Sequence, residues 1–161
     1  NLTTSGTFVT EGTPPEDMQV LTYHDNVVAT PFPFVSLVAS HTVVFTTTPW
    51  TAENGLFSLQ DSAGAVLFGV YSADVFPTSD PNVVTLKGPF TFTGGTGRYT
   101  DITGSGDFDA LISFTTEEEN TGVSTILWSG TATVIPEPSP LVLVGFGVAG
   151  LALWRRRSHG G

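Results

Sequence analysis

The chain of 161 residues is long enough for one domain of ordinary size with an appendage, whereas two compact domains would be crowded. It carries 15 aspartates and glutamates against 5 lysines and arginines, and residues 1–134 hold only two of these cations against 14 of the acids. So acidic a body repels phosphate backbones, which argues against binding of nucleic acid. Cysteine is absent, which excludes disulfides, thiolate nucleophiles and thiolate metal sites.

The first residue is Asn1, and the ten residues that it opens lack the charged and apolar regions of a signal peptide. We interpret the sequence as a chain from which an N-terminal signal has been removed, although an expression fragment would look the same. Export is therefore an expectation that the start of the chain permits.

The body is predicted to be all-β, because apolar residues recur with a period of two and glycine, proline and threonine punctuate the sequence. Residues 108–114 show the pattern best: Phe108, Ala110, Ile112 and Phe114 share one face, and only Leu111 breaks the alternation. Expected strands, in chain order, are 18–24, 41–47, 56–60, 65–71, 83–86, 89–93, 108–114 and 125–134, with a hairpin turn at 61–64 and loops at 12–17, 30–34, 76–81 and 117–120. About eight strands favour a single antiparallel β-barrel or sandwich.

No residue pattern in the body predicts a catalytic, cofactor or metal site. His24, His41 and His159 lie far apart without metal-ligand spacing, and we expect them at the surface or at strand edges. The acidic face that Asp107 would share with its neighbours is interpreted as solvated, since no calcium-loop pattern is present. Trp50, between Pro49 and Thr51, is the aromatic residue that we single out for carbohydrate contact, in a loop context.

Residues 90–99, with the sequence FTFTGGTGRY, are followed by Gly-Ser-Gly at 104–106. This stretch resembles the glycine-rich turn between strands of dirigent-like and allene-oxide-cyclase-like β-barrels. The resemblance covers about 25 residues and implies architecture only. The glycines permit positive φ and close approach of two chains, as a tight β-connection requires, and Ser105 is expected to be a turn residue.

After residue 134 the sequence changes character. Residues 135–140 contain three prolines, among them the motif Pro136-Glu137-Pro138, which prevents continuation of a strand and predicts an extended linker. Residues 141–154 are uncharged and apolar on all sides, and Arg155, Arg156 and Arg157 follow them. A helix of that length spans roughly 21 Å against a hydrocarbon core of about 30 Å. A buried core helix is therefore an alternative, but the arginine flank favours a transmembrane segment with an inside-facing stop.

The order of Pro-Glu-Pro linker, short apolar helix and terminal arginine cluster resembles the PEP-CTERM sorting signal over about the last 27 residues. The resemblance implies that the chain is an exosortase substrate of a Gram-negative, biofilm-forming bacterium, and that exopolysaccharide-rich matrix is its destination. The predicted organisation is a β-rich extracytoplasmic domain over 1–134, a linker over 135–140, and a sorting helix with a basic tail over 141–161.

These observations predict a non-enzymatic, exported cell-surface or matrix protein without a cofactor. It would be anchored in the inner membrane until an exosortase processes it. Two alternatives remain: a barrel that binds or isomerises a small apolar ligand in an internal pocket, and a structural subunit that assembles with copies of itself through exposed strand edges. The sequence does not separate them. A hollow interior with convergent polar groups would favour the first alternative, and a filled interior would not.

Overall fold

The computed structural model describes residues 1–12, 17–30, 32–115 and 120–134. These residues form eight β-strands and one short 3₁₀ helix. In chain order the elements are β1 (Leu2–Glu11), β2 (Met18–Ala29), β3 (Phe34–Val44), β4 (Trp50–Asp61), β5 (Val66–Pro77), β6 (Val83–Gly95), η1 (Gly97–Tyr99), β7 (Ile102–Phe114) and β8 (Thr121–Val134).

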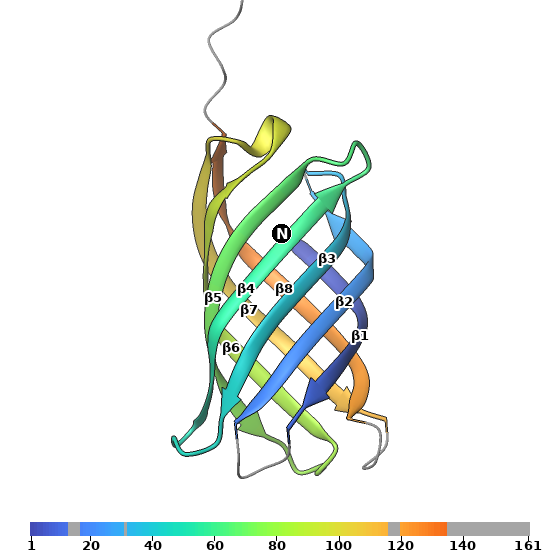
Figure 1. Ribbon diagram of the computed structural model, residues 1–161, viewed down its shortest axis with the longest axis vertical. Coiled ribbons are helices and arrows are strands. Elements are labelled where there is room, and N and C mark those ends of the chain that lie inside the picture. Colours follow the sequence, from blue (N-terminus) through green and yellow to red (C-terminus); the bar gives the residue numbers. More distant parts are fainter. Residues whose placement is uncertain (13–16, 31, 116–119, 135–161) are drawn as a thin grey trace, which may run out of the picture.

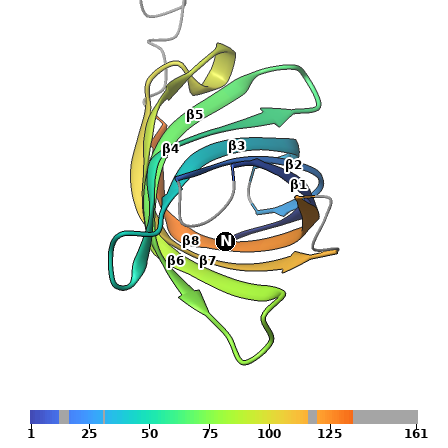
Figure 2. The same cartoon turned by 60° about the horizontal axis from the view of Figure 1, so that its bottom comes forward.

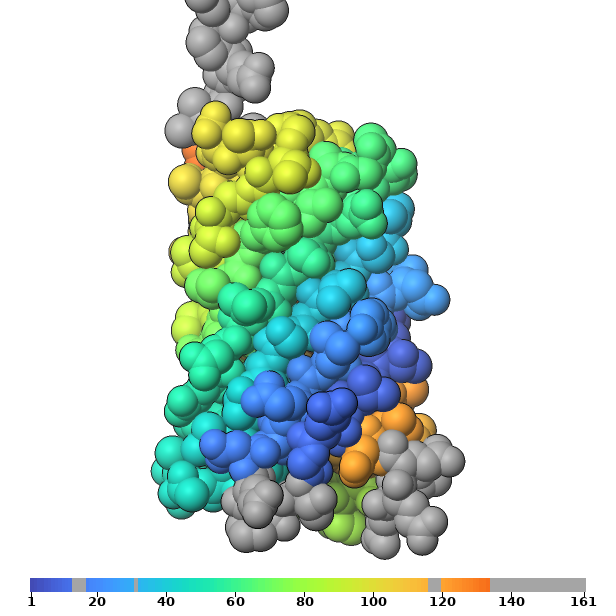
Figure 3. Space-filling model, viewed as in Figure 1, coloured from blue at the N-terminus to red at the C-terminus, as the bar shows by residue number. Residues whose placement is uncertain are grey.

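The strands form a closed barrel in which each strand pairs with its neighbours in sequence and β1 pairs with β8, always antiparallel (Figure 1). Seen with its bottom brought forward, the barrel is a ring of strands (Figure 2). The strands cross its outer surface obliquely (Figure 3), as closure of a barrel requires. The expectation of an all-β barrel of about eight strands is therefore confirmed, and a sandwich is not formed.

The barrel has two ends, which we name by their place in Figure 1. The lower end carries the connections from β1 to β2, β3 to β4, β5 to β6 and β7 to β8. The upper end carries the connection from β2 to β3, the turn between β4 and β5, the segment with η1 between β6 and β7, and the last residue of β8, Val134.

Alternation of side chains puts apolar residues inside and polar residues outside. In β7, Phe108, Ala110 and Ile112 are buried, whereas Asp107 and Leu111 are exposed. The face predicted for residues 108–114 is confirmed, and Leu111 interrupts the pattern because it lies on the outer face. Because the barrel is closed, these inward faces share one interior core.

Strand β1 was not predicted. Its inward positions include Thr4, Gly6, Phe8 and Thr10, of which only Phe8 is apolar. Thr4 is nevertheless fully buried, because β1 closes the barrel between β2 and β8. The apolar period that reveals a strand in sequence is absent here, although the alternation in burial is present.

The strands predicted separately at 83–86 and 89–93 are one strand, β6. The register from β6 to β7 runs without a break through Gly88 and Pro89, whereas the pairing with β5 skips both residues. A proline cannot donate a ladder hydrogen bond, and this local gap on the β5 side removes the need for one. The strand therefore continues past a residue that sequence rules treat as a break.

The glycine-rich segment also differs from expectation. Gly104, Ser105 and Gly106 lie within β7, so Ser105 is a strand residue and the connection is confined to residues 96–101. Gly104 pairs with Phe92, and Gly106 pairs with Phe90. A Cβ atom on Gly106 would lie 2.9 Å from a ring carbon of Phe90, so the glycine leaves room for that ring inside the barrel.

The Pro-Glu-Pro motif, the predicted helix over 141–154 and the arginine cluster lie outside the described residues, as do His159 and most of the loops expected at 12–17 and 117–120. In the part of the chain that is described, no helix has the length and apolar character needed to cross a membrane.

Candidate functional site

The middle of the barrel is filled by aromatic side chains that meet around Trp128. The ring of Trp128 lies 5.0 Å from that of Phe57, and 5.2 Å from each of Phe90 and Phe108, measured between centroids. Tyr71 extends this aromatic layer by an edge contact with Phe108 at 5.3 Å. Such pairs each contribute about 0.5–1.5 kcal/mol beyond burial of their area. The layer divides the interior into an upper and a lower part.

The lower part is hollow. It contains a cavity of about 270 Å³, which we call the lower cavity. Its wall is mostly apolar and comes from strands around the whole barrel, including Phe8, Val20, Val43, Val75, Leu86 and Ile112. Three polar residues line it as well, namely Thr10, His41 and Asn120. Among the described residues of the wall, none carries a charged side chain.

His41 is a buried, titratable residue in the wall of the lower cavity. Only 7% of its surface is exposed, and its Nδ1 lies 2.7 Å from the hydroxyl oxygen of Tyr71. Tyr71 belongs to the aromatic layer and does not line the lower cavity. The two rings meet edge to face, with their centroids 5.7 Å apart. His41 therefore connects the wall of the cavity to the filled middle of the barrel.

Burial lowers the pKa of His41 to about 4, because the charged imidazolium would lose its water. The same cause raises the pKa of Tyr71 above its ordinary value. Both groups are thus neutral near pH 7. The prediction that the histidines lie at the surface or at strand edges is wrong for His41 and for His24, because the barrel turns both side chains inward.

His24 forms a second buried pair. Its Nε2 lies 2.6 Å from the hydroxyl oxygen of Ser124, and both residues are 2% exposed. Burial lowers the pKa of His24 to about 4, an effect that the nearby carboxylate of Asp25 partly opposes. A catalytic Ser-His pair needs a third group to orient the ring. Here Nδ1 of His24 has no hydrogen-bond partner among the described residues, and neither member lines the lower or the upper cavity.

The upper part of the interior contains a smaller, aromatic-lined cavity of about 190 Å³, which we call the upper cavity. Phe32, Phe34 and Phe92 contribute to its wall, together with Leu59. Tyr99 of η1 is 1% exposed and packs on Phe34 with centroids 5.3 Å apart, so η1 is anchored in the core.

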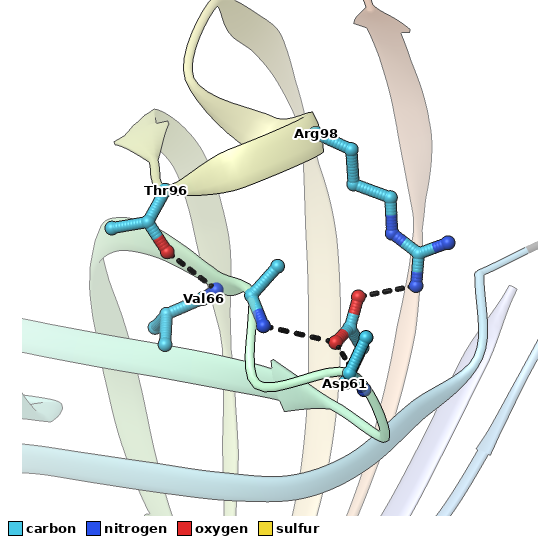
Figure 4. Close-up of polar contacts among 6 residues, drawn as sticks. Asp61, Val66, Thr96 and Arg98 are labelled. Atoms are coloured by element: carbon cyan, nitrogen blue, oxygen red, sulfur yellow. Dashed lines mark hydrogen bonds and ion pairs between the residues drawn. The ribbon is translucent and has the colours of Figure 1, made fainter.

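A polar clamp holds the connections at the upper end together (Figure 4). The buried carboxylate of Asp61 accepts hydrogen bonds from the backbone amides of Ala63 and Ala65 and forms an ion pair with Arg98. Burial by itself would raise the pKa of Asp61, but Arg98 and the two amides outweigh it and lower the pKa below its usual value. In addition, the hydroxyl of Thr96 accepts a hydrogen bond from the Val66 amide at 2.9 Å. The sequence analysis treated Asp61 as an ordinary turn residue and missed this role.

Trp50 is placed differently from expectation. It is the first residue of β4, it is half-buried, and it lines the lower cavity. Its ring packs edge to face on Phe45, with centroids 5.0 Å apart. The acidic face of β7 is exposed, and Asp109 on it forms an ion pair with Lys87 at 2.7 Å. Across the described ranges, no group of three or more acidic or histidine side chains is arranged to hold a metal ion.

The fold and these cavities define the protein as a closed antiparallel β-barrel with an aromatic middle and a partly hollow apolar interior. A comparison with protein-family models matched residues 134–157 to the PEP-CTERM protein-sorting motif. Searches of curated proteins and of solved structures found no match, so the dirigent-like resemblance has no named relative behind it. The chain is thus a β-barrel protein with a PEP-CTERM motif at its C-terminal end, which implies an exported surface protein that an exosortase processes at the membrane.

Proposed function

We propose that the protein is a non-enzymatic component of the cell surface or the extracellular matrix of a Gram-negative bacterium. In this proposal residues 141–154 hold the chain in the inner membrane, and Arg155, Arg156 and Arg157 fix its direction. An exosortase then cuts near Pro136-Glu137-Pro138 and releases the barrel into an exopolysaccharide-rich matrix.

One observation carries the proposal: the barrel ends where the sorting motif begins. Val134 is the last residue of β8, and the matched motif starts at the same residue. A cut near Pro136 would therefore remove no residue from the closed ladder between β8 and its two neighbours. This coincidence supports a folded body and a processed tail as separate parts of the chain.

The buried polar pairs support a role without catalysis. His24 is paired with Ser124 and His41 with Tyr71, and neither pair includes a carboxylate. The Ser124–His24 pair lies away from both cavities and has no orienting third group among the described residues, so it lacks the arrangement of a hydrolytic site. Trp50 stays a candidate for carbohydrate contact, although its packing on Phe45 leaves only part of its ring open.

The closed barrel argues against self-assembly through strand exchange. Each of the eight strands of the described barrel is paired on both sides, so an incoming strand would find no free edge. A homo-oligomer would have to use side chains of the outer face instead. Size-exclusion chromatography with light scattering measures this directly, and we expect a single barrel after processing.

The sorting step is tested in a host that has an exosortase. We expect the wild-type protein on the surface to end near Pro136-Glu137-Pro138 by mass spectrometry. The variant Glu137→Ala should keep residues 141–161 and stay in the inner membrane. Glu11→Ala, which removes an exposed glutamate from the end of β1, is the matched control and should be processed normally. Surface protein that still carries residues 141–161, or normal processing of Glu137→Ala, would contradict the proposal.

A further inference from the structure

We propose that the lower cavity binds a small uncharged apolar molecule bearing one carbonyl oxygen, and that His41 recognises this oxygen through its Nε2. The inference concerns the barrel alone and does not depend on how the tail is processed. It assigns a ligand site to the end of the barrel opposite Val134.

The volume and the wall of the lower cavity determine the size and the apolar character of the ligand. At about 270 Å³ the cavity is close to the lower limit of ligand pockets. With about 30 Å³ for each water-sized group, it accepts a molecule on the order of ten non-hydrogen atoms. Phe8, Val20, Val43 and Leu86 present only carbon to this space. Binding of an apolar body against these side chains is favourable because it removes apolar surface from water.

The hydrogen bond to Tyr71 determines which ring nitrogen of His41 carries the proton. The Tyr71 hydroxyl has one hydrogen-bond partner within the described part of the chain, Nδ1 of His41 at 2.7 Å. Tyr71 is half-buried and its hydroxyl has no other acceptor among the described residues, so we assign Tyr71 as the donor and Nδ1 as the acceptor. A neutral imidazole then carries its own proton on Nε2. His41 lines the lower cavity, and its Nε2 has no hydrogen-bond partner among the described residues.

The N–H group at Nε2 of His41, in an otherwise apolar wall, determines which polar group the ligand can carry. A carboxylate would have to shed its water at a wall whose described residues include no cation, which is costly. A hydroxyl could accept from Nε2, but its own proton would need an acceptor as well. The backbone carbonyl of Asn120 already accepts two hydrogen bonds, from the Thr10 amide at 2.7 Å and from the Thr10 hydroxyl at 3.2 Å. A carbonyl oxygen needs only a donor, and it fits the site without leaving a group unpaired.

The test uses the full-length chain in a nonionic detergent at one fixed concentration, so that partition of the probe into micelles is the same for all variants. The probes are nonan-2-one labelled with carbon-13 at its carbonyl, n-decane of similar size, and nonanoate. We expect saturable binding of nonan-2-one. His41→Leu should weaken this binding about tenfold and leave n-decane unchanged, because only the ketone loses a hydrogen bond. His41→Gln keeps an N–H donor and should bind the ketone within about threefold of wild type.

Two space-filling variants locate the probe. Val43→Phe fills the lower cavity and should abolish binding of both neutral probes, whereas Ala132→Phe at the upper cavity should not. These two variants also test whether the ketone binds in the lower cavity if His41→Leu does not fold. Folding is judged by near-ultraviolet circular dichroism. The carbonyl resonance of the bound ketone should lie at lower field in wild type than in His41→Leu, because only the wild-type site donates a hydrogen bond to it.

Four results would overturn the inference: no saturable binding of nonan-2-one, equal weakening of ketone and alkane by His41→Leu, loss of binding in Ala132→Phe with retention in Val43→Phe, or tighter binding of nonanoate than of the ketone.

Discussion

Two histidines are buried inside the barrel, and their burial has a consequence for stability. The pKa of His41 is about 4 in the folded protein, below the ordinary value of 6.5. Between these two values the unfolded chain binds a proton that the folded chain does not bind. The stabilisation from a neutral, buried His41 is therefore complete above pH 6.5 and is lost as the pH falls toward 4.

We expect the free energy of unfolding of the wild-type protein to fall between pH 7 and pH 4 by roughly 3 kcal/mol more than that of His41→Gln, because glutamine has no proton to gain. Urea unfolding at a series of pH values, followed by near-ultraviolet circular dichroism, measures the difference. Gln19→Glu, on the exposed face of β2, is a control that leaves the interior unchanged. Parallel pH profiles for wild type and His41→Gln would show that His41 is not held neutral by burial.

At the same scale, Thr4 and Gly6 explain why a strand can be present without its usual sequence signal. The interior at β1 takes small and hydroxyl-bearing side chains because the large aromatic rings of other strands already fill the middle of the barrel. Trp128 lies close enough to Thr4 for its Nε1 to donate to the threonine hydroxyl at 3.5 Å. A threonine in that place satisfies the indole N–H, which a valine would not.

At the scale of elements, the turn from β4 to β5 and the segment with η1 are held together by side chains rather than by a ladder. Asp61 binds the two backbone amides of its own turn and pairs with Arg98, whose guanidinium also lies 5.2 Å from the centroid of the Tyr99 ring. The two connections at the upper end are thus coupled by a single charged pair.

We expect Arg98→Ala to lower the melting temperature and to raise hydrogen exchange mainly in the turn and in η1, because it leaves the carboxylate of Asp61 buried without its cation. Lys87→Ala removes the exposed pair with Asp109 and should have a much smaller effect. Melting curves and exchange measured by mass spectrometry compare the two. Equal effects of both variants would show that the clamp contributes no more than a surface pair.

Some strands of the barrel can be predicted from local sequence patterns, and others cannot. Residues 108–114 and 125–134 were predicted because their apolar residues recur with a period of two, and both ranges lie in strands of the barrel. The predicted break between 86 and 89 was wrong, since Pro89 disturbs only one of the two ladders that it could join. The strand that faces the nitrogen of a proline depends on the order of strands in the sheet. Strand order cannot be read from the residues around the proline.

At the scale of the whole molecule, the barrel and the sorting motif meet at residue 134. The barrel closes through the pairing of β1 with β8, and the described core is formed by residues of 1–134. A closed barrel of this kind predicts a body whose stability does not depend on the tail.

We therefore expect a chain truncated after Val134 to stay soluble and to melt at nearly the same temperature as the full-length protein. In cells, deletion of residues 141–154 alone should abolish membrane retention. Differential scanning calorimetry and cell fractionation measure the two effects. An insoluble body, or one that melts several degrees lower, would show that the apolar segment is part of the barrel core.

The sequence by itself determined the all-β class, the approximate number of strands and the sorting motif, because each rests on a local pattern of residues. Only the tertiary structure decided that the sheet closes, that β1 completes it, and that His24 and His41 face inward. It also brought Asp61 to Arg98, 37 residues apart, and left the lower cavity beside His41. Direction of a side chain in a strand alternates with register, and register is fixed by pairing partners far away in the chain. The interior chemistry of a barrel is therefore set by closure, which no single segment encodes.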